Sequence, residues 1–179
     1  QGSSERNISL VVDSKDKAKA MNAIHDAFFL SALKKLHLFV VGTGLVGSTL
    51  LRQLAAEQER LKKEYHLDIH LMGIANSRHM LFNDEDLPLD SCIERLAEAT
   101  EPMEIGAFVD KMQKCNYVNS VFIDCTATDH IPQSYASILS SNIAVVTPNK
   151  KGGAGPLDYY HILMVISRRR EAAFMYETT

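Results

Sequence analysis

The sequence predicts an α/β fold with a doubly wound parallel sheet, preceded by a short β-α fragment. Short apolar runs alternate along the chain with longer segments of helical periodicity, which is typical of strands joined by right-handed helical crossovers. Several runs are almost continuous in Val, Ile, Leu and Phe, as expected for strands covered on both faces. A G-x-G-x-x-G run at residues 42–47 follows one of these strands and opens a helix.

The first elements expected are a strand at residues 8–12 and an amphipathic helix from about Lys15. One strand and one helix cannot bury a core of their own. We therefore expect residues 1–31 to be a fragment that docks on the next domain or on a neighbouring chain. Residues 31–35 form a junction, and a separate domain is predicted at residues 36–179.

This second part alternates between the two kinds of element. Strands are expected at residues 36–41, 68–75, 121–125 and 143–146. Helices are expected at residues 45–64, 104–115, 132–140 and 157–170, with a weaker one at 90–99. The glycine-rich residues 152–156 are predicted to be a flexible loop.

Composition and charge count against several classes of protein. The 179 residues are 46% hydrophobic and 23% charged, which is typical of a soluble globular protein. A formal net charge of -3 gives no electrostatic case for nucleic acid. No long apolar stretch or secretory leader is visible, so we expect no membrane partner and a cytoplasmic location.

The three cysteines form no C-x-x-C pair, so neither a disulfide framework nor a zinc cluster is expected. Because the chain begins with Gln1, we expect it to be part of a longer protein.

The glycine run is the strongest functional signal. A strand that ends in such a loop and continues into a helix brings backbone N–H groups and the helix N-terminus together, where they can hold a pyrophosphate. The strand before, the helix after and a further strand downstream favour a Rossmann-like dinucleotide site over a tight turn without a ligand. The predicted cofactor contacts are Gly42, Thr43, Gly44, Leu45, Val46 and Gly47.

The end of the second strand indicates which dinucleotide is bound. In NAD-preferring sites an Asp or Glu there accepts a hydrogen bond from the ribose 2'-hydroxyl. Asn76, Ser77 and Arg78 lie at this strand end, and we expect all three to contact the cofactor. Asn76 and Ser77 are neutral, and Arg78 offers a fork of donors suited to a 2'-phosphate. The sequence therefore favours NADP over NAD, with Arg78 as the main contact. The alternative is that Arg78 only faces water.

Later strand ends carry groups for the reactive half of the cofactor. We expect Thr126 to contact the nicotinamide ribose and Lys150 to orient a substrate oxygen near the reactive ring, whereas Lys151 is expected to be an exposed loop residue. Cys125 suggests an aldehyde dehydrogenase, but no base can be assigned to activate it, so an inert thiol is favoured. The seven histidines show no ligand spacing and are expected to be structural or solvated.

Six motifs stand in a recognisable order, at residues 41–48, 73–77, 124–126, 146–151, 158–160 and 176–178. Together they resemble the homoserine dehydrogenase part of bifunctional aspartokinase/homoserine dehydrogenases. The resemblance covers residues 36–179. Residues 1–9 resemble the end of the regulatory ACT region that precedes the dehydrogenase in those enzymes.

The resemblance implies an intact protein that phosphorylates aspartate and interconverts aspartate semialdehyde and homoserine with NAD(P)H, and we expect a homo-oligomer. It supports the cofactor contacts at the glycine loop and Thr126, places Lys150 near hydride transfer, and implies that Glu177 lies near a monovalent cation. The kinase would precede this chain and most of the substrate domain would follow it, so the fragment alone is expected to be inactive. The run at residues 152–156 is richer in glycine than the resemblance leads us to expect, which predicts a softer support for Lys150. A nucleotide-sensing regulatory module that never catalyses stays open as the alternative.

Overall fold

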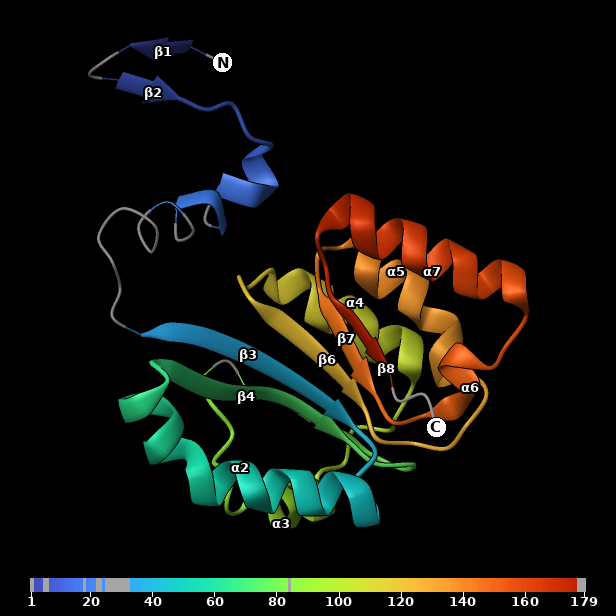
Figure 1. The fold of residues 1–179 in the computed structure, drawn as a ribbon. Helices are drawn as coiled ribbons and strands as arrows, with labels where there is room; N and C mark the ends of the chain where they lie inside the picture. The colour runs from blue at the N-terminus through green and yellow to red at the C-terminus, as the bar shows by residue number, and fades with distance from the viewer. Residues whose placement is uncertain are drawn as a thin grey trace.

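The computed structural model describes residues 2–4, 7–17, 19–21, 24, 33–83 and 85–176. Its main part is a six-stranded sheet with the strand order β5-β4-β3-β6-β7-β8. Every neighbouring pair is parallel except the edge pair β4 and β5. Helices cover both faces of this sheet, so the predicted doubly wound α/β fold is confirmed (Figure 1).

The elements follow the predicted alternation closely. The strands of the sheet are β3 (Lys34–Val41), β4 (Leu67–Ala75), β5 (Met80–Phe82), β6 (Ser120–Asp124), β7 (Ala144–Thr147) and β8 (Phe174–Tyr176). The helices around it are α2 (Leu45–Glu64), α3 (Cys92–Glu98), α4 (Ile105–Cys115), η2 (Ile131–Ser134), α5 (Tyr135–Ser140), α6 (Lys150–Gly153) and α7 (Leu157–Arg170). None of the helices within the described ranges is long and apolar enough to cross a membrane.

Two apolar cores lie on opposite faces of the sheet. Along β3, Leu38 and Val40 join the core beneath α2 and α3, whereas Phe39 and Val41 join the core beneath α4, α5 and α7. Successive side chains of a strand point to opposite faces, so a central strand between two helical layers must be apolar at every position. This is the reason that residues 36–41 form a continuous apolar run.

The domain differs from the predictions in two strands and one loop. The antiparallel strand β5 was missed, because three residues after a tight turn are too few for a periodic signal. The strand β8, which pairs in parallel with β7, is equally short and was also missed. The flexible loop predicted at residues 152–156 is wrong at its start, since Gly152 and Gly153 belong to α6 and Gly152 is buried.

The amino-terminal fragment also differs from the prediction. The strand expected at residues 8–12 is β2 (Asn7–Ser9), which pairs antiparallel with β1 (Gly2–Ser4), a strand that was not predicted. The polar residues of β1 give no strand signal, and their conformation comes from pairing across the hairpin. Beyond β2, a short helix η1 (Ser14–Asp16) precedes helical residues 17, 19–21 and 24, which agrees with the expected helix start near Lys15.

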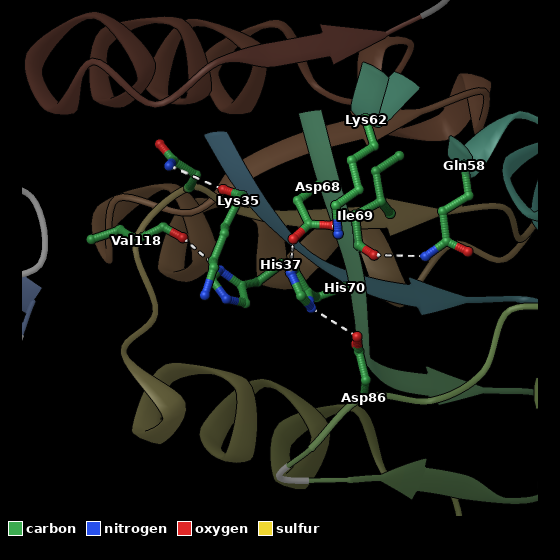
Figure 2. A network of polar contacts seen from close by, with 10 residues as sticks. Lys35, His37, Gln58, Lys62, Asp68, Ile69, His70, Asp86 and Val118 are labelled. Atoms are coloured by element: carbon green, nitrogen blue, oxygen red, sulfur yellow. Dashed lines mark hydrogen bonds and ion pairs between the residues drawn. The ribbon is translucent and has the colours of Figure 1, made fainter. Parts of the chain in front are cut away.

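A polar network ties together the amino-terminal halves of β3 and β4 (Figure 2). His70 lies between two carboxylates, with Nδ1 2.7 Å from Asp86 Oδ2 and Nε2 3.3 Å from Asp68 Oδ2. Lys62 Nζ approaches the other oxygen of Asp68 at 2.9 Å, and His37 Nδ1 lies 2.8 Å from the carbonyl oxygen of Val118. The network lies at the end of the sheet opposite the glycine loop. Among the described residues no group of three or more His, Cys, Asp or Glu side chains could hold a metal ion. The contacts of His37 and His70 link β3 to β4 and to the segment before β6.

Candidate dinucleotide-binding site

The glycine loop lies where three parallel strands end together. The backbone N–H of Gly42 donates to the carbonyl of Ala75 at 2.8 Å, and the N–H of Cys125 donates to the carbonyl of Val41 at 2.8 Å. These bonds join the carboxyl ends of β4, β3 and β6. Because β3 has β4 on one side and β6 on the other, the order of strands reverses here, and ligands of open α/β sheets bind at such a switch point.

The three glycines of the loop have different surroundings. Gly42 has a φ of 95°, and a Cβ there would lie 2.8 Å from the carbonyl carbon of Cys125. A Cβ on Gly47 would lie 1.9 Å from the carbonyl oxygen of Gly42, so this glycine allows α2 to pack against the loop. Gly44 differs, because a Cβ there would meet nothing within 4 Å. Its backbone faces open space, which fits the close approach of a pyrophosphate.

The amino end of α2 leaves its donors available. Gly44 occupies the N-cap position without a side-chain hydrogen bond, and the first turn contains no acidic residue. The N–H groups of a first helical turn have no intrahelical partner, and the helix dipole adds positive charge there. Leu45 and Val46, the first residues of this helix, are 85% and 52% exposed. The residues present therefore fit a bound anion of pyrophosphate type.

The loop after β4 places the predicted specificity residues at the surface. The Oδ1 atom of Asn76 accepts from the backbone N–H groups of Arg78 at 2.7 Å and His79 at 2.8 Å. The carbonyl of this side chain thus holds the turn, whereas a ligand contact had been expected from Asn76. Ser77 and Arg78 are exposed at the tip of the turn, close in sequence to the strand end that bonds Gly42. A cofactor contact by any of the three stays a prediction.

Thr126 adjoins the glycine loop directly. Its Cγ2 atom would lie 2.9 Å from a Cβ on Gly42, and its hydroxyl is 3.2 Å from that of Thr128. Lys150 is the first residue of α6 and is exposed, whereas Lys151 forms an ion pair with Asp129. The structure thus brings Thr126 to the loop and leaves the Lys150 side chain in solvent.

A set of buried polar residues beneath this edge was missed as functional in the sequence. The members are Asp124, Tyr135, Thr147 and Asn149, joined by hydrogen bonds. Asp124 and Thr147 end otherwise apolar strands, which is a signal that could have singled them out. Tyr135 gives no such signal, because a tyrosine at the start of a helix is commonly packed in an apolar core without any functional role.

Cys125 does not have the surroundings of a nucleophile. Burial, with the nearby charge of Asp124, raises the pKa of its thiol to about 11. A thiol with this pKa is protonated at neutral pH, and the thiolate is the reactive form. The inert thiol is therefore favoured, and the aldehyde dehydrogenase alternative loses its nucleophile.

The fold and the open helix N-terminus at the switch point define a Rossmann-type dinucleotide-binding domain. A family model described as "Homoserine dehydrogenase, NAD binding domain" matches residues 42–177, and an ACT domain model matches residues 1–28. The chain belongs to the homoserine dehydrogenase NAD-binding domain family. The resemblance seen in the motifs, including the ACT-like head, is thereby confirmed.

Relatives and solved structures agree with this family. The chain is 38% identical over 180 residues to the chloroplastic bifunctional aspartokinase/homoserine dehydrogenase 2 of Arabidopsis thaliana, covering 100% of this chain and 20% of that protein. It is 36% identical over 178 residues to the bifunctional enzyme of Haemophilus influenzae, covering 99% of this chain and 22% of the relative. The chain thus spans about a fifth of the length of these relatives.

Two solved structures show the same fold. A hyperthermophilic archaeal homoserine dehydrogenase in complex with NADPH matches with a TM-score of 0.65 at 20% identity, covering 80% of this chain and 44% of the other. Homoserine dehydrogenase from Thermoplasma acidophilum matches with a TM-score of 0.64 at 22% identity, covering 80% and 43%. At these identities the likeness supports the fold alone.

Proposed function

We propose that this chain is the NADP(H)-binding part of an enzyme that interconverts aspartate semialdehyde and homoserine by hydride transfer. The intact protein would also phosphorylate aspartate, as the names of its bifunctional relatives suggest. The observation that carries the cofactor proposal is the open backbone at Gly44 beside the uncapped amino end of α2. The nicotinamide supplies or accepts the hydride when it is bound, and the protein supplies binding and orientation.

Each predicted site residue has a role in this proposal. The N–H groups of the glycine loop and of the first turn of α2 hold the pyrophosphate, and Arg78 pairs with the 2'-phosphate of NADP. Thr126 bonds the nicotinamide ribose. Lys150 is the candidate catalytic residue, because an ammonium donor can hold the substrate oxygen beside the ring that exchanges the hydride.

Other expectations stay predictions. The monovalent cation expected near Glu177 falls on a residue outside the described ranges. The cytoplasmic location is also still a prediction, and the names of the plant relatives describe those proteins as chloroplastic. A homo-oligomer of the full-length protein and the domain boundary at residues 31–36 are likewise proposals.

The cofactor preference can be measured by isothermal calorimetry with NADPH and NADH. Arg78→Gln should weaken NADPH binding by about 10- to 100-fold, since a hydrogen bond to a charged group contributes about 1.5–3 kcal/mol. NADH binding should not change. Arg169→Gln is the matched control, because it removes an exposed arginine at the end of α7. Equal wild-type affinity for both cofactors would remove the role of Arg78, and no binding at millimolar cofactor would overturn the cofactor proposal.

The reaction is tested on the full-length protein by following NADPH absorbance with aspartate semialdehyde as substrate. We expect oxidation of NADPH that depends on the semialdehyde, and its loss in Lys150→Ala. A full-length protein that binds NADPH tightly but does not oxidise it with this substrate would favour the nucleotide-sensing module instead.

A further inference from the structure

A buried carboxylate lies under the carboxyl edge of the sheet, and the roles given above do not include it. Asp124 ends β6 and is 0% exposed. Burial of a charge is strongly unfavourable unless hydrogen bonds compensate it. The backbone N–H of Thr126 donates to Oδ1 at 2.7 Å, while the Tyr135 hydroxyl and Asn149 Nδ2 donate to Oδ2 at 2.5 and 3.1 Å. The donors come from three different segments, so one side chain joins the loop after β6, the helix α5 and the turn between β7 and α6.

Asn149 extends this connection to the helix that carries the candidate catalytic lysine. The same Nδ2 atom lies 3.0 Å from the carbonyl oxygen of Thr128 and 3.4 Å from the hydroxyl of Thr126. Its Oδ1 atom accepts from the N–H of Lys151 at 3.2 Å and so caps α6. A single amide therefore binds the Thr126 loop on one side and the helix that begins with Lys150 on the other.

Close packing holds α6 from beneath. A Cβ on Gly152 would lie 2.6 Å from Cε2 of Tyr135, so only glycine lets the helix rest on this ring. The same tyrosine bonds Asp124. Thr147 completes the arrangement, because its hydroxyl donates to the backbone carbonyl of Asp124 at 2.9 Å and accepts from the N–H of Asn149 at 2.9 Å. Gly152, the buried glycine of the run that predicted a soft support for Lys150, is thus closely packed against Tyr135.

We infer that Asp124 and Asn149 are positioning residues that hold Thr126 and Lys150 in the relative placement that hydride transfer needs. This inference rests on the proposed function. A carboxyl group suits the task because its two oxygens can accept several hydrogen bonds, and the three neighbouring groups all donate to them. Asp124 acts through the backbone and side chains around it, since it has no exposed surface that could touch the cofactor or the substrate.

The test uses the full-length enzyme with the substitution Asn149→Ala. This variant loses both the cap on α6 and the link to Asp124, and kcat should fall by about 100-fold, because a misplacement of about 1 Å can have an effect of this size. The dissociation constant for NADPH should rise by far less than kcat falls, since the glycine loop that holds the pyrophosphate is untouched and only the contact from Thr126 is shifted. Leu96→Ala is the control, because it creates a cavity in the core beneath α3 and lowers Tm without touching the polar set. A fall in kcat that Leu96→Ala matches would show a general loss of stability and overturn the inference.

Asn149→Asp gives a second readout, in a variant that keeps an oxygen to cap α6. Its other oxygen would face Asp124 where the amide now donates, and two carboxyl groups this close share one proton. Two facing carboxyl groups can form a hydrogen bond only while one of them carries a proton, so the link is present at lower pH and is lost as pH rises. We expect kcat relative to wild type to fall with rising pH for Asn149→Asp and to stay level for Asn149→Ala. Parallel profiles would overturn the inference.

The outcomes for the two proposals can be told apart. A wild-type enzyme that does not reduce aspartate semialdehyde would overturn the proposed function as well as the inference. An active wild type with unaffected variants would overturn the positioning role alone.

Discussion

The glycines of the nucleotide loop are needed for different physical reasons. Gly42 has a left-handed backbone conformation and touches the end of β6, and Gly47 leaves room for the carbonyl of Gly42. Both requirements exist in the protein without any ligand, because the clashes are with its own backbone. Gly44 has no neighbour in the way of a side chain, so no clash within the protein requires glycine at this position, whereas the close approach of a ligand would.

This difference predicts opposite behaviour for two alanine substitutions. Gly47→Ala should lower the free energy of unfolding by about 1–3 kcal/mol, the usual cost of overpacking, because its Cβ would overlap a carbonyl oxygen. Gly44→Ala should leave Tm near the wild-type value and weaken NADPH binding by at least about tenfold, since the methyl group keeps the phosphates from the backbone. Thermal unfolding and calorimetry on both variants check this. A Gly44→Ala protein with wild-type affinity would contradict the role of that backbone in binding.

At the scale of elements, the far end of the sheet is held by aromatic and polar contacts. His37 on β3 stacks on the ring of Tyr117 with centroids 4.5 Å apart and on His70 with centroids 5.6 Å apart. Its Nδ1 bonds the carbonyl of Val118, which leads into β6. Burial, with added repulsion from His70 and Lys35, lowers the pKa of His37 although the hydrogen bond to Val118 acts in the other direction.

This shift predicts how stability changes with pH. The pKa of the folded state lies below the unfolded value of about 6.5, so the unfolded chain binds the proton first as pH falls. The stabilising contribution of neutral His37 is therefore complete above that value and is lost as pH decreases through it towards the folded pKa. His37→Phe keeps a ring against Tyr117 but cannot titrate, so its stability should fall less steeply with acidification. Urea unfolding at a series of pH values measures this, and a variant curve parallel to the wild-type curve would contradict it.

At the scale of the whole molecule, the described part of the amino-terminal fragment leaves apolar surface exposed. Among its described residues, large apolar side chains are 40% to 96% exposed at Leu10, Val11, Val12, Met21 and Ile24. Buried apolar area is the main source of stability, so a segment that exposes these side chains adds little to the domain. A hydrogen bond from Asn116 Nδ2 to Asp16 Oδ1 at 3.2 Å links the two parts.

A truncated chain that starts at Leu33 should therefore keep the Tm of the whole chain within a few degrees and bind NADPH with the same affinity. A chain that starts at Phe39 is the control. It removes five of the eight residues of β3, the strand that pairs with both β4 and β6, and should not fold. Circular dichroism during heating measures both. A large drop in Tm for the chain that starts at Leu33 would show that the fragment is part of the folding unit.

The predictions succeeded where a segment carries its own periodic pattern. The helix α2 and the strands β3 and β4 were placed within about two residues, because their patterns reflect burial on defined faces. The strands β1, β5 and β8 were missed, since three residues have no period and their conformation depends on a pairing partner. In the candidate site, Thr126 was singled out by its position after a strand. Tyr135 was not, because its hydroxyl acts through contacts with residues 11 and 12 positions away in the sequence.

By itself, the sequence determined the family, the dinucleotide loop and the layered α/β fold, because the glycine spacing and the periodicity of apolar residues are local properties. Only the tertiary structure decided that Gly44 alone among the three glycines faces open space, that Asn76 holds its own turn, and that α6 is a packed helix on Tyr135. These features depend on which strand ends meet at one edge of the sheet. The distances between residues far apart in the chain are set by strand order and packing.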